Sequence, residues 1–138
     1  MKKLVVVLLG AFLLLAAPVG CGTSSVSSGL GERFTLKVGE TVKIASEGLT
    51  LKLDKVLNDS RCPDGASCVW AGQVQCLVTV ELNGKKEQIT LTQLGSTAST
   101  TQIYSRYYLD FDVAPYPKLG ATISSSDYRL NLKVTKIS

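Results

Sequence analysis

Apolar residues at every second position constrain the fold of this chain more than any other feature of its sequence. In the longest run they occupy most even positions from Trp70 to Leu82, while polar residues fill most of the odd positions. A period of two is typical of a β-strand with one buried face, whereas an amphipathic helix repeats about every 3.6 residues. The run ends at Asn83–Gly84, a dipeptide that strongly indicates a two-residue hairpin turn. The sequence therefore predicts a β-hairpin whose first strand places Trp70 in the core.

Further short apolar runs alternate in the same way. They cover residues 34–38, 42–44, 49–53, 89–94, 107–113 and 128–134. Val56 falls out of phase with the third of these runs, which predicts a β-bulge or a strand exit. About seven short strands with turn signals between them predict an all-β domain, specifically an antiparallel β-sandwich of immunoglobulin-like size. A closed β-barrel is the alternative.

The N-terminus indicates export. Two lysines precede an apolar run over residues 4–17, which is shorter than the roughly 20 residues that cross a bilayer as a helix. The segment that follows resembles the bacterial lipoprotein signal, with Cys21 at the lipidated position and Pro18 where that family prefers leucine. The resemblance implies that residues 1–20 are a removed signal peptide and that Cys21 carries a diacylglyceryl and palmitate anchor. We therefore expect an exported protein anchored to the extracytoplasmic side of a bacterial membrane, with plain secretion or an uncleaved anchor as alternatives.

The rest of the chain divides into a short tether and one domain. Residues 21–32 are mostly small, polar and uncharged, a composition that predicts a lipidated flexible tether. Residues 33–138 are then the β-sandwich domain, which is large enough for a single hydrophobic core.

Composition argues against several classes of function. Removal of the signal peptide lowers Lys plus Arg from 15 to 13 against 11 acidic residues, and these charges are scattered, so we expect no nucleic-acid partner. The chain has no histidine, and its single methionine is the initiator. This removes histidine-activated nucleophiles, the common histidine-bearing zinc sites and methionine-rich copper sites. We expect no catalytic residues, no metal and no cofactor, and therefore no enzyme.

The densest group of unusual residues covers positions 58–72 and contains two cysteines. Cys62 and Cys68 flank a Pro-Asp-Gly turn that brings their side chains close together, and in an exported protein such a pair is expected to form a disulfide. Cys76 shares the inward parity of the strand that follows, so we expect it to be a buried free thiol. A bridge between Cys62 and Cys76 is the alternative pairing.

This loop has a structural and a functional interpretation. In the first, it is a stapled connection whose Trp70 anchors the core. In the second, the disulfide reduces the entropy lost on docking, and the loop presents Asp59, Arg61 and Pro63 to a binding partner. A calcium loop is disfavoured, because the acidic residues lack the spacing of such loops and no bidentate glutamate follows.

Two weaker features concern side chains outside the predicted core. Asp110 and Asp112 share an outward strand face, where we expect solvated carboxylates rather than a catalytic pair. Tyr104, Tyr108 and Tyr116 lie off the inward parity or in turns, and exposed tyrosines can stack on sugars or peptides. They make a carbohydrate-binding or adhesion module an alternative function.

Four motifs follow one another along the chain: DSRCP (59–63), CVWAG (68–72), PYP (115–117) and DY (127–128) before the last strand. Together they resemble a set of small bacterial hypothetical proteins and lipoproteins with no established activity, and the resemblance covers residues 34–134. It implies the domain and the cysteine pair, and it implies no catalytic residue. The sequence as a whole predicts a non-catalytic lipoprotein that binds or scaffolds a protein or glycan partner in the cell envelope. The other alternative is inhibition of a peptidase or lysozyme by the loop, which requires an exposed Arg61 held like a substrate.

Overall fold

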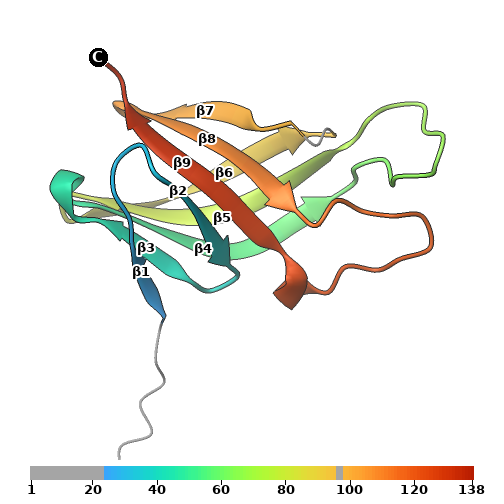
Figure 1. Cartoon of the computed structure of the whole chain (residues 1–138), viewed down its shortest axis with the longest axis horizontal. Helices are drawn as coiled ribbons and strands as arrows, with labels where there is room; N and C mark the ends of the chain where they lie inside the picture. The colour runs from blue at the N-terminus through green and yellow to red at the C-terminus, as the bar shows by residue number, and fades with distance from the viewer. Residues whose placement is uncertain (1–23, 96–97) are drawn as a thin grey trace, which may run out of the picture.

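Two β-sheets face each other in the structure, a computed structural model that describes residues 24–95 and 98–138 (Figure 1). One sheet has the strand order β1 (Ser25–Ser27), β3 (Thr41–Ile44), β4 (Leu49–Asp59), β5 (Gln73–Leu82) and β6 (Lys85–Leu94). The other has the order β2 (Arg33–Lys37), β9 (Arg129–Lys136), β8 (Tyr107–Ala114) and β7 (Thr100–Tyr104). The remaining elements are two short 3-10 helices, η1 (Ala45–Glu47) and η2 (Ser125–Asp127). The predicted all-β sandwich is confirmed.

The pairing of strands is antiparallel except at one edge. β1 pairs in parallel with β3, and each of the other named strand pairs is antiparallel. The seven predicted strands are present, and β1 and β7 are additional edge strands. β1 lies in the segment that was expected to be a flexible tether. Residues 25–27 instead pair with β3, although their side chains are exposed. The predicted signal peptide and the predicted lipidation site Cys21 lie outside the described residues.

The core lies between the inward faces of the two sheets. On β5 the side chains of Val74, Cys76, Val78 and Val80 are fully buried, and the residues between them are not. The predicted irregularity in β4 is confirmed, because the register of its pairing with β5 shifts twice before Asp59. The alternating pattern therefore specified which face of most predicted strands is buried, and it placed the β4 bulge correctly, but Leu94 at the end of β6 is 66% exposed.

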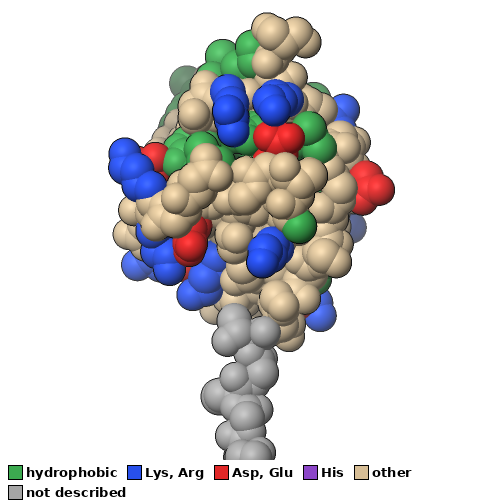
Figure 2. Space-filling view, turned by 90° about the vertical axis from the view of Figure 1, so that its left-hand side faces the viewer, with side chains coloured by type: hydrophobic (Ala, Val, Ile, Leu, Met, Phe, Trp, Pro, Cys, Tyr) green, Lys and Arg blue, Asp and Glu red, His purple; other side chains and the backbone are tan. Residues whose placement is uncertain are grey.

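The sandwich has two contrasting ends, which we call the hairpin end and the loop end (Figure 1). The hairpin end contains η1, the Asn83–Gly84 turn and the Ser105–Arg106 turn, and the C-terminus lies beside it. Its basic and acidic side chains are interspersed rather than gathered into one patch (Figure 2). The loop end contains the connection 60–72 between β4 and β5 and the connection 115–128 between β8 and β9. In the described ranges there is no helix with the length and hydrophobicity needed to cross a membrane.

Candidate binding site

A buried arginine ties the two long connections together at the loop end. Arg61 is 3% exposed. Its guanidinium donates two hydrogen bonds to the carboxylate of Asp59, from Nε at 2.8 Å and from Nη2 at 2.6 Å. The same guanidinium donates to the carbonyl of Val113 at 2.7 Å and to that of Pro115 at 2.9 Å. Asp59 belongs to β4 and Val113 to β8, so one side chain links the two sheets. We call this arrangement the arginine brace.

Two tyrosines from the connection 115–128 complete the brace. The guanidinium carbon of Arg61 lies 5.1 Å from the ring centre of Tyr116, a cation–π distance. The hydroxyl of Tyr128 donates to Asp59 Oδ2 at 3.0 Å. Among the described residues, no buried side-chain nitrogen or oxygen lacks a hydrogen-bond partner. The charged pair is therefore fully satisfied, which is the condition under which a buried ion pair is tolerated.

The ionisation of the brace follows from its geometry. Burial by itself raises the pKa of Asp59, but the hydrogen bonds and positive charge of Arg61 outweigh burial, so the pKa lies below the ordinary value. Burial, reinforced by the adjacent carboxylate of Asp59, raises the pKa of Tyr128 to about 12. At neutral pH the ionised carboxylate of Asp59 therefore accepts hydrogen bonds from Arg61 and from the neutral phenol of Tyr128.

The connection 60–72 is also closed on itself and pinned to its neighbour. Cys62 and Cys68 form the predicted disulfide, with an S–S distance of 2.11 Å. At the base of the connection, the amide of Cys62 donates to the carbonyl of Ala71 at 2.9 Å. The backbone of Asp64 makes two hydrogen bonds to the connection 115–128. Its amide donates to the carbonyl of Pro117 at 2.9 Å, and its carbonyl accepts from the amide of Leu119 at 3.0 Å. The two connections thus form one supported surface.

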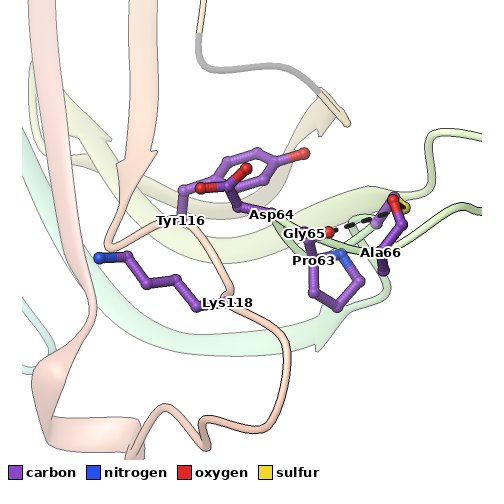
Figure 3. Close-up of a pocket in the computed structure, with 7 residues that line it drawn as sticks. Pro63, Asp64, Gly65, Ala66, Tyr116 and Lys118 are labelled. Atoms are coloured by element: carbon purple, nitrogen blue, oxygen red, sulfur yellow. Dashed lines mark hydrogen bonds between the residues drawn. The ribbon is translucent and has the colours of Figure 1, made fainter.

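A hollow of about 580 Å³ opens between these connections (Figure 3). It is lined by Cys62, Pro63, Asp64, Gly65, Ala66, Tyr116 and Lys118. In Figure 3 the side chain of Lys118 extends away from Pro63 and Ala66, and the Asp64 carboxylate is seen across the ring of Tyr116. The hollow therefore offers one aromatic ring, one acidic group and one basic group.

The predicted presentation of Asp59 and Arg61 to a partner is wrong. Both side chains are buried in the brace. The guanidinium of Arg61 also donates to the backbone carbonyls of Val113 and Pro115, which would otherwise lack a donor. Pro63, the third residue of that prediction, lines the hollow and is half-buried. The sequence does contain a signal for the pair, because Asp59 and Arg61 are two positions apart, but their burial depends on partners more than 50 positions away.

Trp70 is also not where the sequence placed it. Its side chain is 64% exposed, and its neighbour Val69 is fully exposed, so Trp70 does not anchor the core. The strand begins at Gln73, because Gly72 has a φ of 72° and interrupts the extended backbone before the alternation starts. The alternation of buried and exposed residues therefore holds from Val74 onward, and it does not apply to Trp70, which precedes the turn.

The remaining candidate residues lie on separate surfaces. Asp110 and Asp112 on the outer face of β8 both bind Arg33, at 3.3 Å and 2.7 Å, so they form a charge-paired cluster. Tyr104 packs against the core and donates to Glu87, whereas Tyr108 is exposed on the outer face of β8. The structure therefore does not bring the three predicted tyrosines together, and only Tyr116 lines the hollow.

The third cysteine of the described chain is a buried thiol. Cys76 is fully buried on β5 and has no disulfide partner, as predicted, and burial raises its pKa to about 12. Within the described ranges, no group of three or more histidine, cysteine, aspartate or glutamate residues is placed to hold a metal ion.

Comparison with protein-family models, with curated proteins and with solved structures finds no match to this chain. Its function must therefore be argued from its own residues.

Proposed function

We propose that this chain is a non-catalytic, lipid-anchored module of the bacterial cell envelope that binds a macromolecule through its loop end. The observation that carries the proposal is an exposed tryptophan, Trp70, beside a restrained backbone. Trp70 follows the disulfide residue Cys68 and precedes Ala71 and Gly72, whose carbonyls accept hydrogen bonds from Cys62 at 2.9 Å and Gly95 at 2.7 Å. The backbone beside Trp70 is restrained in this way, which reduces the backbone entropy that is lost when its ring binds a partner.

The support beneath this surface favours binding over a purely structural role. The arginine brace, the disulfide and the Asp64 bridge restrict the two connections, yet Trp70, Val69 and Leu119 on them remain exposed. Tryptophan is enriched among the residues that dominate binding energy at interfaces. The flat outer face of β5 is by contrast polar at Gln73 and Gln75.

The peptidase-inhibitor alternative lacks the feature that motivated it. That hypothesis requires Arg61 to be exposed and held like a substrate side chain, whereas Arg61 is 3% exposed and binds Asp59 and two carbonyls. We therefore do not carry it further.

The binding end is tested by photo-cross-linking in the native bacterium. A benzophenone amino acid replaces Trp70 in one full-length variant and Lys85, an exposed residue of the hairpin end, in the matched control. Benzophenone inserts into C–H bonds of proteins and glycans alike. We expect an adduct from position 70 and none from position 85. Adducts of equal yield from both positions, or none from position 70, would overturn the assignment of the loop end.

The anchor is tested separately. Metabolic labelling with a palmitate analogue should label the full-length chain and leave Cys21→Ser unlabelled. Label that persists in Cys21→Ser would contradict the proposed lipidation site.

A further inference from the structure

The Tyr116 ring in the hollow has one face covered and one face available. The guanidinium of Arg61 lies over the ring at 5.1 Å, and Arg61 is buried, so the covered face is directed toward the interior of the protein. Tyr116 lines the hollow and Arg61 does not, so the hollow borders a part of the ring that the guanidinium leaves uncovered. The ring is fixed by the brace before any ligand arrives, which makes it a ready stacking platform.

The polar groups around this platform have no partners of their own. The backbones of Asp64 and Lys118 are joined in a parallel bridge, yet both side chains are exposed and make no hydrogen bond or ion pair with a described residue. The carboxylate of Asp64 can only accept hydrogen bonds at neutral pH, and the ammonium of Lys118 can only donate them. The hollow therefore supplies one acceptor and one donor beside one aromatic face.

This combination selects among classes of ligand. An anion in the hollow would lie near Asp64, and a cation would lie near Lys118, so neither charge is favoured. A wholly apolar ligand would remove water from both charged groups without replacing its hydrogen bonds. A neutral ligand with one apolar face and a rim of hydroxyl groups satisfies all three side chains. A pyranose ring has that form, and a volume of about 580 Å³ is within the range of small-molecule sites.

We infer that the hollow binds one hexopyranose unit of a glycan, with its C–H face on Tyr116 and its hydroxyl groups bonded to Asp64 and Lys118. This inference rests on the proposed function of the loop end and names the chemistry of its ligand. No bond is made or broken, and the glycan is bound as it arrives.

The test uses two soluble oligosaccharides of different linkage. Full-length protein, in a detergent without a sugar head group, is titrated with chitotetraose and with maltohexaose by NMR or calorimetry. For one open site with one stacking residue we expect a Kd of about 1 mM for at least one of them. Tyr116→Ala should weaken that binding about tenfold or more, and Tyr116→Phe should retain it, because the ring and not the hydroxyl forms the platform.

Two further variants keep the result decisive if loss of Tyr116 disturbs the brace. Asp64→Asn changes only an exposed group and should weaken binding several-fold while the melting temperature is unchanged. Tyr108→Ala removes an exposed tyrosine from the outer face of β8 and should leave binding unchanged.

Two results would overturn the inference. One is no binding of either oligosaccharide up to about 10 mM, and the other is binding that neither Tyr116→Ala nor Asp64→Asn weakens. If the oligosaccharides fail while position 70 still cross-links to a protein, the loop end remains the binding end and only the glycan inference is lost.

Discussion

The two ends of this sandwich are closed by different kinds of contact. At the hairpin end, Asn83 and Gly84 have φ values of 50° and 81°, and the turn they form joins adjacent strands. At the loop end, Arg61 bonds to residues 52 and 54 positions away, and Tyr128 bonds to a residue 69 positions away. The Asn83–Gly84 turn follows from local turn chemistry. The brace, like the contacts of Glu47 with Tyr107 and Lys136 at the hairpin end, exists only when both sheets are assembled. The stability of the loop end therefore depends on a few long-range contacts.

Each end also holds one carboxylate in its ionised form. Hydrogen bonds from Tyr107 and then from Lys136 lower the pKa of Glu47 at the hairpin end. At the loop end burial opposes ionisation, and Arg61 lowers the pKa of Asp59 in spite of it. Burial therefore opposes ionisation of both carboxylates, but it is the largest single influence only on the pKa of Asp59.

The comparison is tested most severely by removal of the brace. Arg61→Met should reduce the free energy of unfolding by about 3–5 kcal/mol, because it leaves the Asp59 carboxylate and two carbonyls buried without their donor. Arg106→Ala at the hairpin end removes an exposed side chain that donates one hydrogen bond, to the Tyr107 hydroxyl, and should cost about 1 kcal/mol or less. Urea denaturation measures both. Equal costs would remove the distinction between the two ends.

A matched pair of glycine substitutions gives the next largest difference. Gly72 and Gly84 both have positive φ, but a Cβ on Gly72 would lie 1.8 Å from the carbonyl oxygen of Ser60, and one on Gly84 meets nothing within 4 Å. Gly84→Ala should cost about 1 kcal/mol through backbone strain alone. Gly72→Ala should cost at least about 2–4 kcal/mol, because steric overlap is added to strain. Similar melting temperatures for the two variants would show that the backbone of Ser60 gives way easily.

Loss of the disulfide should have an intermediate effect. The bridge between Cys62 and Cys68 closes a short segment, so the double variant Cys62→Ser/Cys68→Ser should lose roughly 2 kcal/mol of stability. The wild-type protein under reducing conditions is the matched measurement, and it should unfold at the same urea concentration as the double variant. No loss in either case would mean that the brace alone holds the connection.

The response to acid separates the two carboxylates. A carboxyl group with a lowered folded-state pKa contributes stability above its unfolded pKa, and that contribution is lost as pH falls through the folded-state pKa. The domain should therefore weaken as pH falls below about 4. In Glu47→Gln, which still accepts a hydrogen bond from Tyr107, the decline should be smaller and the part due to Asp59 should remain. Urea denaturation between about pH 7 and pH 2 measures the decline. A decline identical to wild type would assign the acid response to other groups.

The smallest effect on stability is expected at Trp70. Because its side chain is 64% exposed, Trp70→Ala should change the free energy of unfolding by less than about 0.5 kcal/mol. If Trp70 lay in the core, as the alternation implied, the same substitution would lower the free energy of unfolding by about 3–5 kcal/mol. A large loss would return Trp70 to the core and would weaken the argument for the loop end as the binding end.

Sequence reasoning worked where a structural decision is made by neighbouring residues. The spacing around the Pro-Asp-Gly turn predicted the disulfide, and the parity of Cys76 predicted its burial. The same reasoning failed at β7, whose polar residues have no clear alternation, because its edge position is decided by pairing with β8. It also failed at Trp70, because Gly72 adopts a positive φ and separates Trp70 from the alternating residues of β5.

By itself the sequence determined the all-β class, the inward face of the predicted strands, the Asn83–Gly84 turn and the Cys62–Cys68 bridge, because each depends on contacts or periodicities within a short stretch of chain. Only the tertiary structure decided that Arg61 is buried, that Trp70 is exposed, and that Tyr116 lies over a guanidinium beside Asp64 and Lys118. The physical reason is that a charged side chain is buried only where partners exist to satisfy it. For Arg61 two of those partners are the carbonyls of Val113 on the opposite sheet and of Pro115 in the connection after it. The sequence around residue 61 does not predict either contact.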